Sequence, residues 1–271
     1  MANVNFENTA LPDIIELKNV SQKYGQTSII EGLNLLIEDK PNQGQFVVVL
    51  GHSGCGKSTI LRYIAGLQQP TAGEILIKGK PRTRDDRVSM AFQQYSSLPW
   101  YSVLENVALG LEFAGVSKKE REDKAREMIK LVGLEGHEHK NALYPILSGG
   151  QLQRVAIARS LLANPEILLM DEPFGALDIH TRLSMQDLLV SIWNKLQLTV
   201  VFVTHDISEA VYLGDEIWLM STNPGQIVER ISVTSALNLT SNAVKDKQLK
   251  RTKAFTDLVY NIEDKMMQLK R

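Results

Sequence analysis

The stretch FVVVLGHSGCGKSTILRYIAGL, residues 46–67, decides the fold. Its first five residues, Phe46–Leu50, are apolar throughout, as in a strand that is covered on both faces, and LRYIAGL has a helical pattern. Between them, the glycines of GHSGCGKST let the backbone turn tightly, so that successive N–H groups face one anion. The stretch therefore predicts a strand, a phosphate-binding loop and a helix that begins near Lys57.

The loop fits the P-loop pattern, which binds nucleotide phosphates. We expect Lys57 to reach the β- and γ-phosphates of ATP, Ser58 to place its hydroxyl on Mg²⁺, and Thr59 to lie close to the α-phosphate. The alternative is a glycine-rich turn with a surface lysine, which the flanking strand and helix disfavour. The residues expected to contact nucleotide here are Gly51, His52, Ser53, Gly54, Cys55, Gly56, Lys57, Ser58 and Thr59.

A second apolar run, Ile167–Met170, ends in two carboxylates, Asp171 and Glu172. Strand ends are where doubly wound folds place their ligands. Asp171 suits the shell around Mg²⁺, and Glu172 suits the orientation or deprotonation of the water that attacks in phosphoryl transfer. Alone, such a pair is better explained by a helix cap or a solvated turn. Beside a P-loop, the catalytic interpretation is favoured.

Composition and charge exclude several classes of protein. The chain has 271 residues, of which 44% are hydrophobic and 23% charged, as in a globular protein with one large α/β domain or a domain with an insertion. A net charge of -1 disfavours nucleic acid as a main partner. The single cysteine, Cys55, and the absence of a secretion-signal pattern at the start indicate a reducing cytoplasm. All apolar runs are far shorter than the roughly 18 residues that span a bilayer, so a membrane role requires a partner.

Short β-branched runs alternate with longer helical patterns, which predicts a mainly parallel sheet. Val200–Val203 is a third fully apolar strand, after Phe46–Leu50 and Ile167–Met170. Alternation at Ile15 to Lys18, followed by Leu33–Ile37, predicts a half-exposed antiparallel layer, and a further short strand is expected over residues 74–78.

The middle of the chain has helical periodicity instead, over residues 103–114 and 118–132, with glycine stops. We predict an inserted helical subdomain over about 95–160 within a main domain of 14–240. Residues 1–13 form an N-terminal extension in this scheme, and residues 241–271 form a C-terminal one with a helix over 255–269.

The segment LSGGQLQR, residues 147–154, resembles the signature of ATP-binding-cassette (ABC) ATPases. Its small residues present backbone N–H groups at a helix start, which forms an anion site, although an ordinary helix cap is the better explanation of the segment by itself. The resemblance implies that this segment contacts nucleotide through Ser148, Gly149, Gly150 and Gln151.

The family's other landmarks follow in the expected order, from about residue 14 to 231. Tyr24 is similar to the aromatic residue that stacks on adenine. Gln93, with Gln94 as a neighbouring alternative, resembles the glutamine that reaches the metal and the γ-phosphate. Asp178, at the end of GALD, resembles the loop that signals between paired subunits, and His205 resembles the switch histidine at the γ-phosphate.

The resemblance implies an ABC ATPase fold, a P-loop NTPase core with an antiparallel β layer, that binds ATP and Mg²⁺ and hydrolyses ATP with Glu172, His205 and Lys57. One chain would hold half of each active site, so a second ATPase subunit, most simply an identical one, would complete it. Transmembrane permease subunits would be driven by the cycle, at the cytoplasmic face of the membrane. The expected permease-docking surface comprises Tyr95, Leu98, Trp100 and Tyr101.

The segments LPWYSVLENV, EPFGALD and STNPGQI resemble ATPase subunits of importers for nitrate, sulfonate, taurine and bicarbonate, which work with a solute-binding protein. The alternatives are an exporter subunit, a ribosome- or DNA-acting ABC protein, and a regulatory module that binds ATP without hydrolysing it. Paired cassettes are absent, and Glu172 and His205 are intact, so the last two are disfavoured. His137 and His139 suggest a metal site less well than an exposed loop.

Overall fold

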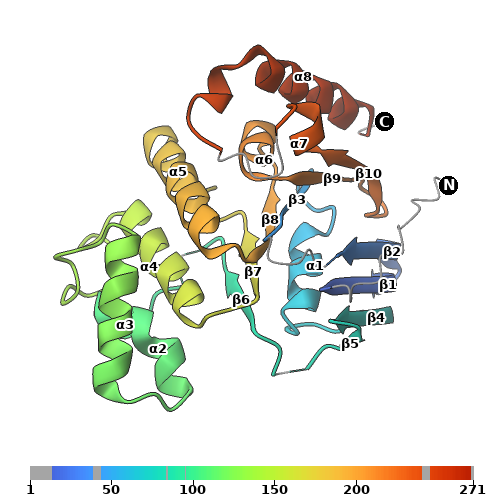
Figure 1. The fold of residues 1–271 in the computed structure, drawn as a ribbon. Helices are drawn as coiled ribbons and strands as arrows, with labels where there is room; N and C mark the ends of the chain where they lie inside the picture. The colour runs from blue at the N-terminus through green and yellow to red at the C-terminus, as the bar shows by residue number, and fades with distance from the viewer. Residues whose placement is uncertain (1–13, 39–43, 84, 95, 240–244, 270–271) are drawn as a thin grey trace. The chain divides into compact units, whose positions relative to one another are not determined.

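The computed structural model describes residues 14–38, 44–83, 85–94, 96–239 and 245–269. The chain forms two compact units (Figure 1), of which the first comprises Met1–Asp86 and Thr199–Arg271 and the second comprises Arg87–Leu198. Within the described ranges, no helix is both long and apolar enough to cross a membrane. The predicted domain boundaries remain predictions, and the predicted extension over residues 1–13 lies outside the described residues.

The first unit contains parallel strands that position the phosphate-binding loop. Strand β3 (Phe46–Gly51) pairs in parallel with β8 (Thr199–Thr204) on one side and with β9 (Glu216–Met220) on the other. Strand β10 (Ile227–Ser232) runs antiparallel to β9. All residues of β3 and β8 are buried, which explains their continuous apolar sequence. Both predicted strands are therefore confirmed.

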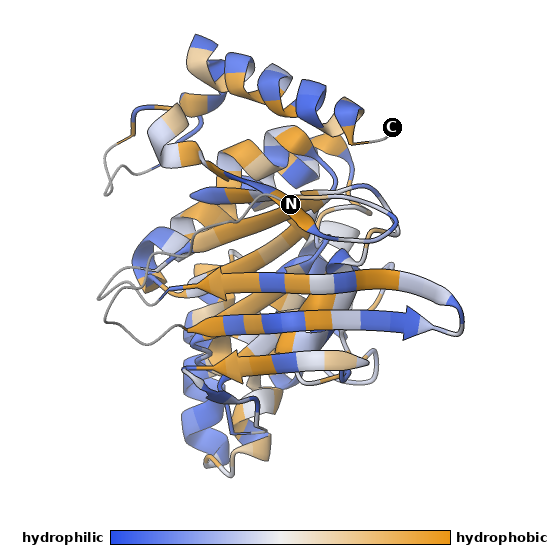
Figure 2. Cartoon of the chain, turned by 90° about the vertical axis from the view of Figure 1, so that its right-hand side faces the viewer, coloured by the Kyte–Doolittle hydropathy of each residue, from blue (hydrophilic) through white to orange (hydrophobic). Residues whose placement is uncertain are grey.

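The same unit contains the predicted antiparallel layer. Its strands are β1 (Ile15–Tyr24), β2 (Thr27–Ile37), β4 (Ala72–Ile77) and β5 (Lys80–Pro81), in the order β2-β1-β4-β5. Apolar and polar bands alternate along the two long strands (Figure 2), because one face is buried and the other is not. Strand β4 begins two residues before the predicted start, where Ala72 pairs with Ser21.

The helices of the first unit are α1, α6, α7 and α8, together with one turn of 3₁₀ helix. Their bounds are Lys57–Ile64, Ile207–Leu213, Val233–Ala236, Lys253–Gln268 and Leu249–Arg251 for the 3₁₀ turn. Helix α8 starts two residues earlier than predicted, because Thr252 caps it by accepting a hydrogen bond from Phe255 N at 3.2 Å. Phe255, Ile262 and Met266 are its buried residues.

The second unit combines two parallel strands with four helices. Strand β6 (Val88–Ala91) pairs with β7 (Ile167–Asp171), and the helices are α2 (Val103–Phe113), α3 (Lys118–Leu131), α4 (Gly149–Leu162) and α5 (Ile179–Leu196). Helices α2 and α3 end within one residue of the predicted positions. The charged face of α3 carries i,i+4 ion pairs, as its sequence predicts.

Candidate active site

Lys57 lies at the first position of α1, directly after the loop that β3 feeds. Gly56 adopts φ 104°, a left-handed conformation that favours glycine, and this turn starts the helix. The Lys57 side chain is buried, and its ammonium donates hydrogen bonds to Gly51 O at 2.9 Å and His52 O at 3.1 Å. The Lys57 side chain therefore lies against the loop. The backbone N–H groups of the first turn of α1, which have no partner within the helix, are at the same end of that helix.

The turn that contains Gly225, far along the chain, packs against the P-loop. Gly225 N donates to Ile29 O at 2.8 Å, and a Cβ at position 225 would lie 2.1 Å from the carbonyl oxygen of Cys55. Ile30 contacts the loop as well, because a Cβ at Gly56 would lie 2.9 Å from its Cγ1. The sequence shows an NPG turn at this point but gives no sign that it packs against the P-loop.

Tyr24 and His205 also belong to the first unit. Tyr24 ends β1 with 54% of its surface exposed, and its hydroxyl accepts a hydrogen bond from Gln68 Nε2 at 2.8 Å. A tyrosine whose hydroxyl is held and whose surface is more than half exposed suits stacking on a base. His205 is exposed in the turn between β8 and α6.

Polar contacts on both sides of His205 hold that turn. Thr204 Oγ1 donates to Glu209 Oε2 at 2.6 Å and accepts from Asp206 N at 3.0 Å. The Asp206 carboxylate caps α6 through Glu209 N at 2.9 Å. The backbone of His205 is therefore fixed by its neighbours, and the residue is exposed.

In the second unit, Asp171 is buried at the end of β7 and Glu172 follows it with φ 43°. A left-handed conformation is uncommon for a non-glycine residue, costs about 1–3 kcal/mol and clusters at functional sites. Gln93 lies nearby, since the position of a Cβ on Gly175 is 3.7 Å from Gln93 Nε2 and 4.0 Å from Glu172 Oε2. The structure thus brings two of the predicted site residues together across 79 positions of sequence.

Gly175→Ala tests that juxtaposition. The backbone there accepts a side chain, and the added methyl meets Glu172 O at an ordinary 3.4 Å, so the fold should persist. The methyl occupies the space beside Gln93 and Glu172, and we expect kcat for ATP hydrolysis to fall roughly tenfold through misplacement of these groups. Steady-state hydrolysis with a thermal melt as the folding control measures this, and an unchanged kcat would show that the space is not used.

The signature segment forms the start of α4. Ser148 Oγ accepts from Gln151 N, and Gln151 Oε1 accepts from Ser148 N at 2.9 Å, a reciprocal cap. The Gln151 amide also contacts His137 Nε2 at 3.0 Å, a link that the sequence did not indicate. Gly150 is buried, and a Cβ there would lie 2.5 Å from Thr181 Cγ2, so glycine lets α4 approach α5 closely.

Asp178 caps α5, since its Oδ1 accepts from Thr181 N at 3.0 Å. Hydrogen bonds from Thr181 hold the pKa of the Asp178 carboxyl below its usual value. The cap and the predicted signalling role are compatible, because the side chain is exposed. The candidate residues thus fall into two groups: the P-loop, Tyr24 and His205 in the first unit, and the remaining ones in the second.

Comparison with known proteins identifies the family. The model of the family described as "ABC transporter" matches residues 37–175, which is half of the chain. The chain belongs to the ABC transporter family. It is the ATP-binding, ATP-hydrolysing subunit of an ABC transporter, and the predicted P-loop NTPase fold is confirmed.

Two relatives of this ABC subunit align with it over most of both chains. The taurine import ATP-binding protein TauB of Rhizobium johnstonii is 50% identical over 213 residues, which cover 78% of this chain and 79% of the relative. TauB of Pseudomonas putida is 45% identical over 223 residues, 81% of this chain and 83% of the relative.

Solved structures give the same result. The dimeric structure of a bacterial ABC transporter cassette is 36% identical, with a TM-score of 0.69, and the match covers 81% of this chain and 98% of that one. A post-hydrolysis state of the same cassette, bound to ADP and Pi, matches with a TM-score of 0.68 at 36% identity.

Proposed function

We propose that this ABC subunit powers the import of a small solute of the taurine, sulfonate or nitrate class. The identity of 50% to a taurine import ATP-binding protein, over most of both chains, carries this proposal. The subunit would lie at the cytoplasmic face of a membrane, bound to permease subunits, and a solute-binding protein would deliver the solute.

Growth of the source organism with the gene deleted tests the solute class. Loss of growth on taurine as the sole sulfur source, restored by the wild-type gene but not by one carrying Glu172→Gln, supports the proposal. Growth on taurine that does not depend on the gene argues against taurine. A defect restricted to nitrate as the sole nitrogen source would assign the nitrate branch of the class.

In the proposed nucleotide site, the loop Gly51–Thr59 binds the phosphates, and Tyr24 stacks on adenine. The buried Lys57 ammonium supports this, because it already donates to backbone carbonyls of the loop and can donate to phosphate oxygens at the same place. The signature segment Ser148–Gln151 would contact the nucleotide held by a second subunit, with Asp178 at the junction between the two. The dimeric form of the similar cassette supports an identical second subunit.

We propose Ser58, Gln93 and Asp171 as the donors to Mg²⁺. All three supply oxygen, and the set contains one carboxylate, as suits a cation that takes its other ligands from phosphate and water. Within the described ranges, no three His, Cys, Asp or Glu side chains gather into a separate metal cluster. When bound, the cation neutralises charge on the β- and γ-phosphate oxygens.

For hydrolysis, we assign Glu172 to the attacking water and His205 to the γ-phosphate. The left-handed backbone at Glu172 turns the side chain out of the direction of β7, and Gln93 lies beside it. His205 stands in the fixed turn before α6. Each group thus projects from the end of a buried strand, which is where catalytic groups of this fold class are placed.

The proposed permease-docking surface consists of Leu98, Trp100 and Tyr101, since Tyr95 lies outside the described residues. Trp100 is 68% exposed, and its ring meets Tyr101 edge-on at 6.4 Å. Asn106 of α2 holds the loop from behind: it accepts from Leu98 N at 2.8 Å and donates to the carbonyls of Leu98, Tyr101 and Ser102. An exposed aromatic on a fixed loop suits a binding surface.

Trp100→Ala is expected to reduce solute uptake by at least about tenfold, because one buried aromatic anchor contributes 2 kcal/mol or more to an interface. ATP hydrolysis by the isolated subunit should stay within about twofold of wild type. Phe113→Ala is the matched control, since Phe113 is 82% exposed at the other end of α2 and should leave uptake unchanged. Equal uptake defects in both variants would argue against the surface.

A further inference from the structure

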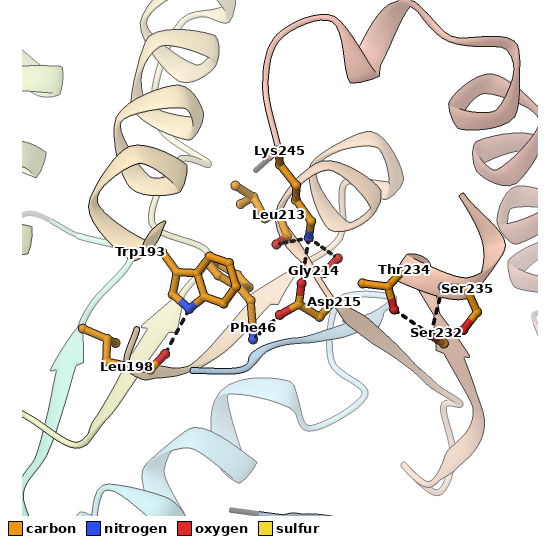
Figure 3. Close-up of polar contacts among 10 residues, drawn as sticks. All are labelled: Phe46, Trp193, Leu198, Leu213, Gly214, Asp215, Ser232, Thr234, Ser235 and Lys245. Atoms are coloured by element: carbon orange, nitrogen blue, oxygen red, sulfur yellow. Dashed lines mark hydrogen bonds and ion pairs between the residues drawn. The ribbon is translucent and has the colours of Figure 1, made fainter. Parts of the chain in front are cut away.

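Within the first unit, a buried lysine holds the C-terminal segment, residues 245–269, against the end of α6 (Figure 3). Lys245 is 6% exposed, and its ammonium donates to Leu213 O at 2.9 Å and Gly214 O at 2.5 Å, with Asp215 Oδ1 at 3.2 Å. Burial lowers the pKa of Lys245, and the Asp215 carboxylate opposes that shift. Burying a cation is costly unless it is paired, and here every contact lies where α6 ends, the negative pole of that helix.

Asp215 extends this contact to the strand that leads into the P-loop. Its Oδ2 accepts from Phe46 N at 2.9 Å, and its own N–H donates to Phe46 O at 2.7 Å. Phe46 is the first residue of β3, which ends at Gly51. One carboxylate therefore joins Lys245 to the base of the P-loop strand, as the dashed lines of Figure 3 show.

The rest of the segment contacts α6, the P-loop and β10. The Lys250 ammonium lies 3.7 Å from the centre of the Tyr212 ring in α6, a cation–π contact. At the far end of α8, Met266 O lies 3.4 Å from His52 Nε2 in the P-loop. Lys265 pairs with Glu229 of β10. The segment thus spans from the end of α6 to the phosphate-binding loop.

Helix α6 is short enough for its two ends to be coupled. It runs over Ile207–Leu213, two turns, and begins two residues after His205. The carbonyls at its end, Leu213 O and Gly214 O, are the ones that Lys245 binds. If these two carbonyls lose their hydrogen bonds to Lys245, we expect the last turn of α6 to fray. Because α6 has only two turns, fraying at its end should also loosen the turn that carries His205.

We propose that Lys245 is a positioning residue for ATP hydrolysis, which holds α6 through its C-terminal carbonyls and thereby fixes His205. This inference rests on the proposed role of His205 at the γ-phosphate. Lys245 contacts no nucleotide in this scheme, so it affects the chemical step and not nucleotide affinity.

Lys245→Met in the full chain tests the proposal, with Lys265→Met as the matched control, since it removes the lysine of another ion pair in the same segment without touching α6. We expect kcat to fall about tenfold in Lys245→Met with KM for ATP within about twofold, and both constants to stay unchanged in Lys265→Met. An unchanged kcat, or a raised KM at constant kcat, overturns the proposal.

Two further variants separate positioning from folding and from the role of His205. Lys245→Met with Asp215→Asn removes both charges, which relieves the unpaired carboxylate and should restore the thermal stability. The proposal requires kcat to stay low in this stable double variant, and a wild-type kcat contradicts it. Adding Lys245→Met to His205→Ala should cause no further loss. A fully active His205→Ala would instead refute the proposed function of His205 itself.

Discussion

Glu172→Gln is expected to slow ATP hydrolysis by at least about 10²-fold while ATP binding is retained, because an amide cannot accept a proton from the attacking water. The substitution is nearly isosteric, so the left-handed backbone at this position and the neighbouring Gln93 amide should be preserved. In the proposed site the nucleotide is bound by the P-loop, and Glu172 is not part of that loop. If hydrolysis is the step that lets the proposed dimer reopen, the variant should accumulate as an ATP-bound dimer.

Phosphate release measures the rate of ATP hydrolysis, and size-exclusion chromatography with ATP measures the fraction of dimer. Glu127→Gln is the matched control: it makes the same change on the exposed face of α3 and should hydrolyse ATP as the wild type does. If Glu172→Gln keeps more than half of the wild-type rate, the water is activated by another group and the assignment of Glu172 is wrong.

Gly225→Ala is expected to abolish ATP binding, although position 225 lies far from the P-loop in sequence. The new Cβ would lie 2.1 Å from Cys55 O, 2.6 Å from Met220 Cε and 3.0 Å from Ile29 O. Two of these atoms belong to the backbone, so the methyl cannot be accommodated by a side-chain rotation. Either the P-loop moves or the fold is destabilised by several kcal/mol, since overpacking and strain are among the few causes of effects above about 4 kcal/mol.

Fluorescent-nucleotide titration together with thermal unfolding distinguishes a displaced P-loop from a destabilised fold. We expect ATP binding to be lost in either case. Gly110→Ala provides the control, because its Cβ in α2 meets only Ala163 at 3.5 Å and beyond. Alanine is favoured over glycine inside a helix by up to about 1 kcal/mol, so this variant should be as stable as the wild type or more so. ATP binding by Gly225→Ala with wild-type affinity would show that the turn is not a rigid support.

The elements that could be predicted from the sequence are those whose signal is local. Strand β3 and the start of α1 follow from an apolar run, clustered glycines and a helical pattern that lie within 20 residues. Helices α2 and α3 follow from periodicity and from stops at glycine. The order of motifs then indicated the ABC ATPase family, which the comparisons confirmed.

Contacts between distant segments could not be predicted, because a residue type carries no sign of its partner. Nothing in the sequence links Gly225 to Cys55, or Lys245 to the end of α6. The left-handed backbone of Glu172 was equally hidden, since local propensity predicts the opposite. The signature segment shows a further limit: its serine forms the ordinary helix cap that was the competing interpretation, and the two roles share one backbone geometry.

The hydrogen bonds that Asn106 makes to the loop in front of it have a consequence for how a partner is chosen. A loop that is already ordered loses little conformational entropy when a partner binds. The free energy of its contacts with the partner is therefore not offset by the cost of ordering the loop, and affinity is higher. Asn106 supports the loop, whereas the exposed Trp100 belongs to the proposed docking surface, so the two can vary independently. Two neighbouring residues of this loop, Pro99 and Trp100, are exposed. Exchanging only these two between related subunits should therefore transfer partner preference without a loss of stability.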